Sequence, residues 1–482
     1  MKLQEMTALA RRLPDVEIAG LTADSRAVKP GWLFAALSGT QADGRTYIES
    51  AIQNGAAAIL ARPGTPAPVP VVESEQPRLT LAQLAMCFHP QQPRMIAGVT
   101  GTNGKTSVAR FASQLWDLCG HAAGSLGTLG AFAPGYDYAL KHTTPDPVEI
   151  HQVLSGMTTV GTTHLAMEVS SHGLAQYRAD GVNFQIAAFT NLTRDHFDYH
   201  GSFEEYYKAK RRLFTQLLPR GNAVVINTDG PYAETAVQDA KAYGRRPVTV
   251  GRQGETLRLL SVKPAAAGLD IAVEAAGKRY MLRLPMIGSF QADNALVAAA
   301  IVMESGHSAD EVLPLLEKIS AAPGRMEPAG VRRFPDGEAG VFVDYAHTPA
   351  AVETVLKAIR PHTAGRIHVI VGAGGDRDTA KRSQMGAAAA SLAEHVIITD
   401  DNPRTEDPAF IRAQVAEGAP KATIIGDREE AIRHGVASLK AGDTLVIAGK
   451  GHERGQMVGD VIYPFSDLEK AREALQKVGG DA

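Results

Sequence analysis

Short apolar runs and segments with helical spacing alternate through the last third of the chain. The apolar runs fall at about 341–345, 367–372, 395–399, 422–426 and 444–448. The helical segments fall between them, at about 349–360, 380–393, 407–418 and 428–440. This alternation is typical of βαβ units, which build a parallel sheet covered by helices on both faces. We therefore expect residues 326–482 to form a Rossmann-like parallel-sheet domain.

Polar residues directly follow four of these expected strands. These polar residues lie in the segments 344–347, 372–378, 400–404 and 449–453. The carboxyl ends of parallel strands lie at one edge of the sheet, and ligands of open α/β sheets bind in the crevice outside that edge. The four segments are therefore predicted to form a binding site.

A glycine-rich turn, Gly98-Val-Thr-Gly-Thr-Asn-Gly-Lys-Thr-Ser107, lies between a short apolar run and a helical segment in the middle of the chain. Such a turn holds nucleotide phosphates, because backbone N–H groups and the helix dipole face the anion. Lys105 is expected to reach the outer phosphates and Thr106 to bind Mg²⁺. The usual spacing has glycine where this chain has Val99, so the motif is a variant. The alternative is a tight turn with a fortuitous Lys-Thr pair; we interpret the turn as an ATP or GTP site.

Two further expected strands, 164–169 and 185–190, lead to Glu168 and His196 at the same edge of the central sheet. Either residue alone would equally suit a surface or capping role. Beside a phosphate loop, a carboxylate and an imidazole favour a Mg²⁺ site. Lys210 lies in a Lys- and Arg-rich helical segment, 203–214, and composition alone predicts that this side of the helix is exposed to solvent.

Length and linker-like stretches predict the domain organisation. A chain of 482 residues suggests roughly three domains of about 150 residues. A proline- and polar-rich stretch at 89–94 and a linker-like stretch with proline and glycine at 321–328 separate three blocks, which we expect to be domains 1–90, 91–325 and 326–482.

The composition, with 44% hydrophobic and 21% charged residues, is that of an ordinary globular protein. A formal charge of −3 gives no electrostatic reason to expect nucleic acid as a partner. Cys87 and Cys119 form no metal or redox motif, which suggests a reducing compartment. Residues 1–20 lack an apolar signal core, and no run approaches the roughly 18 apolar residues of a membrane span. We expect a cytoplasmic protein without a membrane span.

Several motifs together resemble the Mur ligases, cytoplasmic ATP-dependent enzymes that form the amide bonds of the peptidoglycan stem peptide. The motifs are Thr100–Thr106, Met167–Gly173, Asn191–Asp198, Gln291–Asn294 and Asp344–His347, with Asp24–Arg26 and Gln41–Arg45 near the start. The resemblance covers essentially the whole chain. It implies an α/β protein of three domains: an N-terminal UDP-substrate-binding domain, a central phosphate-loop ATPase-like parallel-sheet domain and the C-terminal Rossmann-like domain.

The stretch Asp401-Asn-Pro-Arg404 resembles the signature of the family members that add meso-diaminopimelate, whereas lysine-adding relatives differ at the arginine. The resemblance implies that Arg377 and Arg404 bind the distal carboxylate of this amino acid and that Glu453 faces its distal ammonium. The implied diaminopimelate-binding residues are Arg377, Asp401, Asn402, Pro403, Arg404, Gly449 and Glu453.

The resemblance also assigns the two nucleotide sites. The ATP-binding residues it implies are Gly101, Thr102, Asn103, Gly104, Lys105, Thr106, Ser107, Asn294, Arg325 and Asp344. Those for the UDP-linked substrate are Ala23, Ser25, Thr40, Gln41, Ala42, His142, Thr143, Thr144, Ser170, Gln176 and Arg178. Relatives commonly have asparagine at the position of His142, so this carry-over is a departure from the family pattern.

The catalytic residues implied are Lys105, Glu168, His196 and Lys210, and the Mg²⁺ ligands are Thr106, Glu168, His196 and Lys210. By similarity Lys210 is an N6-carboxylysine, formed when CO₂ converts the amine to a carbamate. This modification requires a partly neutral amine, so we expect burial and the neighbouring Arg211 and Arg212 to lower its pKa from the ordinary value of about 10.4.

The implied reaction is ATP- and Mg²⁺-dependent amide formation through an acyl phosphate. We expect small-molecule substrates, a monomer, and a hinge near 321–328 that closes on ATP. One alternative is a sister ligase, which adds D-alanyl-D-alanine or extends folylpolyglutamate. Another is a nucleotide-gated binding or regulatory protein that performs no chemistry. The sister ligases should lack Asp401-Asn-Pro-Arg404, and the binding protein should release no phosphate.

Overall fold

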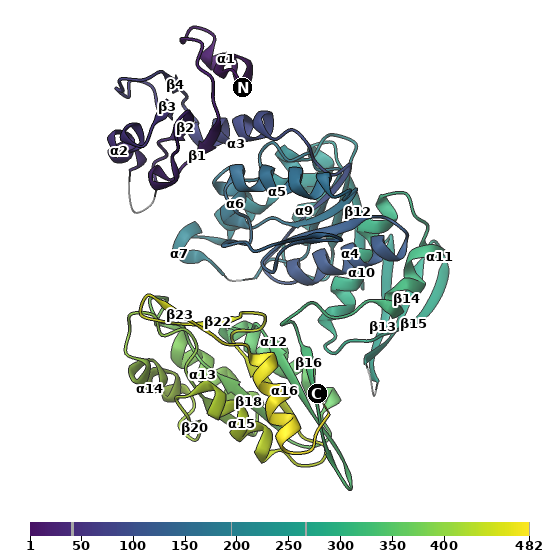
Figure 1. The fold of residues 1–482 in the computed structure, drawn as a ribbon. Coiled ribbons are helices and arrows are strands. Elements are labelled where there is room, and N and C mark those ends of the chain that lie inside the picture. The colour runs from purple at the N-terminus through teal and green to yellow at the C-terminus, as the bar shows by residue number, and fades with distance from the viewer. Residues whose placement is uncertain (40–42, 194, 266–267, 482) are drawn as a thin grey trace. The chain divides into compact units, whose positions relative to one another are not determined.

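A computed structural model describes residues 1–39, 43–193, 195–265 and 268–481 (Figure 1). The chain divides into two compact units. The first contains Met1–Arg258 and Leu296–Val312, and the second contains Leu259–Ala295 and Leu313–Ala482. The division falls within strand β13 (Leu257–Ala265) and within helix α10 (Phe290–Glu304).

The first unit begins with a small parallel sheet whose strands pair in chain order. Its strands are β1 (Gly20–Thr22), β2 (Trp32–Ala35), β3 (Ala56–Ala61) and β4 (Val71–Glu73). The accompanying helices are α1 (Leu3–Met6), α2 (Ile48–Gln53) and α3 (Pro77–Phe88). The residues between α3 and the next strand, at Met95, adopt neither helix nor strand.

A larger sheet follows in the same unit. Its strands are β5 (Met95–Thr100), β6 (Ala123–Gly127), β7 (Gly130–Ala133), β8 (Tyr136–Tyr138), β9 (His164–Glu168), β10 (Ile186–Phe189), β11 (Ala223–Asn227) and β12 (Arg246–Gly251). They lie in the order β12-β11-β10-β5-β9-β6-β7-β8, and all neighbours are parallel except the β6–β7 and β7–β8 pairs. The helices are α4 (Lys105–Leu118), α5 (Pro147–Thr159), α6 (Ser171–Ala175), α7 (Phe197–His200), α8 (Phe203–Arg212), α9 (Ala233–Ala242) and α11 (Ala309–Val312).

The strand order places three loops at one edge of this sheet. β5 lies between β9 and β10, with Val99 opposite Glu168 and Thr100 opposite Phe189. The glycine-rich turn after β5 therefore has Glu168 on one side and the segment after Phe189 on the other. Helices α5, α8 and α9 pack on one face of the sheet through a continuous apolar cluster, and α4 packs on the other face (Figure 1).

The second unit contains the antiparallel pair β14 (Gly268–Ala275) and β15 (Lys278–Leu284) and a six-stranded sheet. The strands of this sheet are β16 (Glu327–Phe334), β17 (Gly337–Asp344), β18 (Ile367–Val371), β19 (His395–Ile398), β20 (Thr423–Ile424) and β21 (Thr444–Ala448). The order is β16-β17-β21-β18-β19-β20, and only β16 is antiparallel to its neighbour.

Helices cover both faces of this second sheet. They are α12 (Pro349–Ile359), α13 (Lys381–Leu392), α14 (Pro408–Gly418), α15 (Arg428–Ser438) and α16 (Asp467–Lys477). One apolar cluster joins the strands to α12, α13 and α14, and a second joins the alternate strand positions to α15 and α16. A short antiparallel hairpin, β22 (Gly455–Val458) with β23 (Val461–Pro464), precedes α16. The predicted Rossmann-like parallel sheet is confirmed.

Among the helices of the described residues, none combines the length and the apolar composition that crossing a membrane requires. Cys87 and Cys119 are both free thiols.

Candidate active site

The glycine-rich turn after β5 is compact because two of its residues have backbone angles that suit glycine. Gly101 has φ 146° and Gly104 has φ 85°. A Cβ at Gly101 would lie 1.9 Å from Thr190 Oγ1, so no larger residue fits. Helix α4 then starts at Lys105, and its first N–H groups are aimed at the turn. The geometry is that of an anion site at a helix N-terminus.

The segment after β10 fixes the turn from one side. Asn191 accepts hydrogen bonds from the N–H of Asn103 through its side chain (2.9 Å) and from the N–H of Thr102 through its carbonyl (2.9 Å). The N–H of Thr193 donates to Thr102 Oγ1 at 3.0 Å. The motif that begins at Asn191 is therefore a support for the phosphate loop.

Two lysines converge on one carbonyl of this turn. Lys105 Nζ donates to Gly101 O at 2.9 Å, and Lys210 Nζ, from α8, donates to the same oxygen at 2.7 Å. Lys210 is fully buried, 4.3 Å above the Tyr206 ring centre. Burial, and then the charge of Lys105, hold the pKa of Lys210 well below its ordinary value.

These positions correct two expectations. Composition predicted an exposed lysine at 210, and the structure buries it because it lies on the inner side of α8. Arg211 and Arg212 were expected to lower the pKa of Lys210, but Lys105 is the cation that does so. Arg211 pairs with Asp239 and Arg212 with Asp180.

Hard oxygen ligands are paired next to the turn. Thr106 Oγ1 donates to Glu168 Oε2 at 3.0 Å, and both side chains are buried. The N–H of Thr128 donates to Glu168 Oε1 at 2.8 Å, which fixes the carboxylate. A hydroxyl and a carboxylate at this distance suit a Mg²⁺ ion. The part of the chain that the structure describes holds no cluster of three or more His, Cys, Asp or Glu side chains that could bind a metal.

His196 lies at the outer end of the same loop region. It has φ 55°, is exposed, and its Nε2 is 3.3 Å from Asp195 Oδ2. Its ring packs edge-on against His172, with centroids 4.8 Å apart. Its assignment as a metal ligand stays a prediction.

Five of the residues expected to bind the UDP-linked substrate lie together around Thr144, which is buried. Thr144 Oγ1 donates to the carbonyl of Glu168 (3.1 Å) and accepts from the N–H of Ser170 (2.9 Å). Arg178 donates to the carbonyl of Thr144 (2.9 Å) and to Gln176 Oε1 (2.7 Å). Thr143 shares a hydrogen bond of 2.9 Å with Thr128, the residue that holds Glu168.

His142 is exposed overall, but partial desolvation of its ring and, to a smaller extent, the charge of Arg178 lower its pKa below the ordinary value. Ser25 begins a short 3-10 helix, with Ala23 exposed just before it. Asp24, between them, has a lowered pKa, chiefly through its hydrogen bond to Arg26 and in part through Lys141. Thr40, Gln41 and Ala42 lie outside the described residues.

Three expected ATP residues lie in the second unit. Asp344 ends β17, buried, and accepts from the N–H groups of Met326 (2.7 Å) and Ala346 (2.8 Å). Burial raises its pKa to about 6, although Arg325 opposes this. Arg325 lies 4.5 Å above the Tyr345 ring. Asn294, near the start of α10, donates to Gln291 Oε1 at 3.2 Å.

The turn after β19 holds Asn402 and Arg404 in place. Arg404 has φ 51° and donates through Nη1 to Gly375 O at 2.7 Å. Asn402 donates through Nδ2 to Glu453 Oε2 at 3.0 Å. The strand order thus brings the predicted residues from the loops after β18, β19 and β21 together. Asp401 and Pro403 are buried in this turn, Gly449 packs against Asp401, and Arg377 is exposed in the loop after β18.

Sequence reasoning missed Lys450. Its side chain has no solvent exposure, and Nζ donates to Asn402 Oδ1 and to Glu453 Oε2, both at 2.9 Å. A lysine between two candidate ligand-binding residues fixes their orientation. The signal in the sequence was its place between Gly449 and Glu453, directly after a buried strand.

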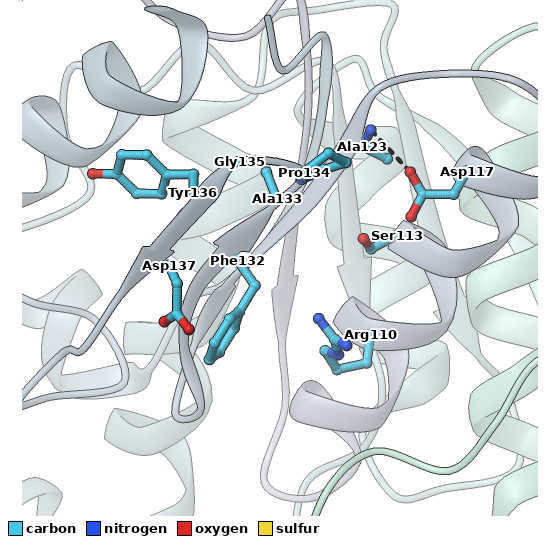
Figure 2. A pocket seen from close by; sticks show the side chains of 10 residues that line it. All are labelled: Arg110, Ser113, Asp117, Ala123, Phe132, Ala133, Pro134, Gly135, Tyr136 and Asp137. Carbon is cyan, nitrogen blue, oxygen red and sulfur yellow. Dashed lines mark hydrogen bonds between the residues drawn. The ribbon is translucent and has the colours of Figure 1, made fainter. Parts of the chain in front are cut away.

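A separate cavity of about 580 Å³ lies between α4 and the β7–β8 hairpin (Figure 2). Arg110, Ser113 and Asp117 face it from α4, and Phe132 faces it from β7. Arg110 also lines a much smaller space that Thr106 and Glu168 share. None of the predicted site residues within the described ranges lines the larger cavity.

Family models match the chain over three consecutive stretches. The model of the Mur ligase family catalytic domain matches residues 17–91, that of the Mur ligase middle domain 99–302, and that of the Mur ligase glutamate ligase domain 324–451.

The chain is also similar to curated proteins and solved structures. Proteins of Caulobacter vibrioides and Mesorhizobium japonicum are 50% and 47% identical over 472 and 466 residues, covering 96% of this chain and 96% of each relative. Both are named UDP-N-acetylmuramoyl-L-alanyl-D-glutamate–2,6-diaminopimelate ligase. A solved structure of that name has a TM-score of 0.70 and 31% identity over 99% of both chains.

A MurF ligase from Thermotoga maritima, solved with ADP, has a TM-score of 0.61 and 17% identity over 95% of this chain and 97% of its own, which shows the shared fold. The three family models and the relatives at about half identity agree over nearly the full length. The chain therefore belongs to the Mur ligase family.

Proposed function

We propose that this protein is an ATP-dependent ligase that joins meso-2,6-diaminopimelate to the D-glutamate of UDP-N-acetylmuramoyl-L-alanyl-D-glutamate. Its place would be the cytoplasmic synthesis of peptidoglycan precursors. Family membership and the names of relatives at 47–50% identity support the proposal. The phosphate loop and the charged turn after β19 supply its chemistry.

The observation that carries the choice of amino acid is the juxtaposition of Arg404 and Glu453. Both contact Asn402: Arg404 Nη1 donates to the Asn402 carbonyl (3.5 Å), and the Asn402 side-chain amide donates to Glu453 Oε2 (3.0 Å). A guanidinium fork matches a carboxylate, and a carboxylate matches an ammonium. The distal end of diaminopimelate carries both groups, whereas L-lysine carries the ammonium alone.

In the first step, a γ-carboxylate oxygen of the D-glutamate attacks the γ-phosphorus of ATP. A new P–O bond forms, the bond to the β-phosphate oxygen breaks, and ADP leaves. Lys105 and the first N–H groups of α4 would neutralise the charge that moves onto the leaving phosphate. Asn294, Arg325 and Asp344 are proposed to hold the nucleotide.

Thr106, Glu168, His196 and Lys210 in its carbamate form would hold Mg²⁺. When bound, Mg²⁺ neutralises the phosphate oxygens. A neutral Lys210 amine can add to CO₂ with release of a proton, and burial with Lys105 nearby favours the neutral amine. The buried Thr106–Glu168 pair supplies oxygen ligands of the type that the ion prefers.

In the second step, the amino group of diaminopimelate attacks the acyl carbon. The C–N bond forms, phosphate leaves with the C–O electron pair, and the nitrogen loses a proton to water. Arg404 and Arg377 would bind the distal carboxylate and Glu453 the distal ammonium. The protein contributes mainly positioning and charge neutralisation.

We further propose that domains 1–90, 91–325 and 326–482 bind the UDP moiety, ATP and the amino acid, respectively, in a monomer. The three family-model matches fall within or close to these limits. His142, Thr143, Thr144, Ser170, Gln176 and Arg178 would contact the muramoyl peptide.

The test is phosphate release from ATP with the UDP-dipeptide and meso-diaminopimelate, each omitted in turn. We expect full turnover only when all three substrates and Mg²⁺ are present. Lys105→Ala should lower the rate by about 10²–10³-fold. Lys208 is an exposed lysine of α8 that pairs with Glu205, and Lys208→Ala should leave the rate unchanged. Phosphate release independent of both other substrates would contradict the proposal.

A further inference from the structure

Two loops at the carboxyl edge of the second unit's sheet, 372–378 after β18 and 400–406 after β19, are bonded directly to each other. The N–H of Gly375 donates to Asn402 O at 2.9 Å, and Thr405 Oγ1 donates to Asp376 Oδ1 at 2.7 Å. Arg404 Nη1 donates to Gly375 O at 2.7 Å. The direction of the Arg404 guanidinium is therefore set by the loop after β18 as well as by its own turn.

The contact between these loops is close and strained. A Cβ at Gly375 would lie 1.9 Å from Pro403 O. Asp376 and Arg404 have φ of 54° and 51°, in the left-handed region. Aspartate is tolerated there better than most residues, so the unfavourable conformation is mainly that of Arg404. Such angles persist only where surrounding contacts impose them. Contacts from neighbouring side chains must therefore stabilise this conformation of the two loops.

The Arg382–Glu406 ion pair lies at this position. Arg382, on α13, has no solvent exposure and donates to both carboxylate oxygens of Glu406 at 2.8 Å. Arg382 Nη2 also donates to Gly374 O at 3.1 Å, and the N–H of Asp376 donates to Glu406 Oε1 at 2.5 Å. The pair thus holds one loop at two backbone positions and the other at Glu406.

The bidentate ion pair also stabilises the ionised form of Glu406. The hydrogen bond from Arg382, more than any other contact, lowers the pKa of Glu406 to about 2. Glu406 is therefore ionised at every pH at which a ligase is assayed. Removing either partner leaves the other charge without its counter-ion, so the arrangement is disrupted as a whole.

We propose that Glu406, held by Arg382, is a positioning residue for amino-acid specificity. The pair holds the two loops in the register that directs Arg404 toward the distal carboxylate of the amino acid. Neither residue of the pair touches the ligand in this account. The inference rests on the proposed function and goes beyond it, because it assigns a role in specificity to two residues that do not themselves contact the ligand.

Glu406→Ala and Glu406→Gln test the proposal in the full-length enzyme. We expect the KM for meso-diaminopimelate to rise by about tenfold or more in Glu406→Ala, since small misplacements of a binding group cost up to about 10²-fold. Glu406→Gln keeps an acceptor oxygen and should fall between wild type and alanine. The KM values for ATP and the UDP-dipeptide, and kcat at saturating diaminopimelate, should change little. Selectivity against L-lysine should fall.

Glu394→Ala is the matched control. Glu394 accepts from the N–H of Ile367 at 2.7 Å and pairs with Arg360 at 3.1 Å, at the opposite edge of the same sheet. Equal increases in KM for both alanine variants would indicate general loosening and overturn the proposal. So would an unchanged diaminopimelate KM in folded Glu406→Ala, judged by its thermal midpoint. If Glu406→Ala does not fold, Glu406→Gln and Arg382→Lys are measured instead. A raised KM for meso-diaminopimelate supports the proposal, and an unchanged KM in the folded variants overturns it.

The two proposals fail in different ways. A wild-type enzyme that does not use meso-diaminopimelate contradicts the proposed function. A wild-type enzyme that uses it, with Glu406 variants of unchanged KM, contradicts only the positioning role.

Discussion

The Thr106 hydroxyl donates a hydrogen bond of 3.0 Å to the Glu168 carboxylate, joining the start of α4 to the end of β9. The contact follows from the strand order, because β9 lies directly beside β5 and Glu168 is opposite Val99. It places a hydroxyl and a carboxylate, two ligands suited to Mg²⁺, at the foot of the phosphate loop.

Glu168→Gln is expected to weaken the response to Mg²⁺ selectively. The amide retains the shape of the side chain but loses the negative charge that a divalent cation requires. We expect about a 10²-fold loss of turnover at saturating ATP and a higher Mg²⁺ concentration for half-maximal rate. A Mg²⁺ titration of phosphate release measures both, with circular dichroism to check folding. An unchanged Mg²⁺ dependence would show that Glu168 does not bind the metal.

Lys210→Ala is expected to abolish ligation because it removes the buried amine that would become the carbamate. Added short carboxylic acids should restore part of the rate by replacing the missing oxygens. Full activity in the variant, or in wild-type enzyme from which CO₂ depletion has demonstrably removed the carbamate, is incompatible with this role. Mass spectrometry under native conditions checks the presence of the extra carboxyl group.

Arg404→Ala is expected to raise the KM for meso-diaminopimelate. The rise should correspond to a loss of about 2–4 kcal/mol of binding free energy if the ion pair with the ligand is largely desolvated. Arg404→Lys retains the charge but loses the bidentate fork and should be intermediate. The KM values for ATP and the UDP-dipeptide should stay near those of the wild type. Arg472→Ala, an exposed arginine of α16, is the control. Equal effects on all three substrates would argue for a structural role.

Acid is expected to destabilise the fold through His151. This ring has no solvent exposure, and within the described residues its Nδ1 has no hydrogen-bond partner. Burial lowers its pKa from 6.5 to about 4. Between these values the unfolded chain binds a proton that the folded chain does not, so stability declines as the pH falls from 6.5 toward 4. His164, whose pKa burial also lowers to about 4, acts in the same direction.

Urea midpoints at pH 7, 5.5 and 4.5 measure this decline. His151→Gln should make the decline shallower, whatever its effect at pH 7. His434→Gln, at an exposed position of α15, should leave the slope unchanged. A His151→Gln slope equal to that of the wild type would show that this residue does not cause the loss.

The centre of the C-terminal sheet was predictable because β18 and β21 are buried on both faces and read as uninterrupted apolar runs. The expected strand 367–372 is β18 (Ile367–Val371), and the expected helix 428–440 is α15 (Arg428–Ser438). The shared edge of the loops followed from parallel pairing. Strand β16 escaped prediction because it mixes charged and apolar residues, and it begins inside the linker expected at 321–328.

Contacts within the site were less predictable than its location. Lys450 and Arg382 are buried cations whose partners, Glu453 and Glu406, depend on how loops fold back on the sheet. Composition marked Lys210 as exposed, although it lies on the inner side of its helix. Family resemblance indicated these loops, but the hydrogen bonds that orient each side chain require coordinates.

The most direct test is the specificity of the unmodified enzyme toward amines. Phosphate release and product mass are measured with ATP, the UDP-muramoyl-dipeptide and, separately, meso-diaminopimelate, L-lysine and D-alanyl-D-alanine. We predict efficient ligation of meso-diaminopimelate, weak use of L-lysine and no use of D-alanyl-D-alanine. Equal kcat/KM for L-lysine and meso-diaminopimelate, or preferred use of D-alanyl-D-alanine, would contradict the account.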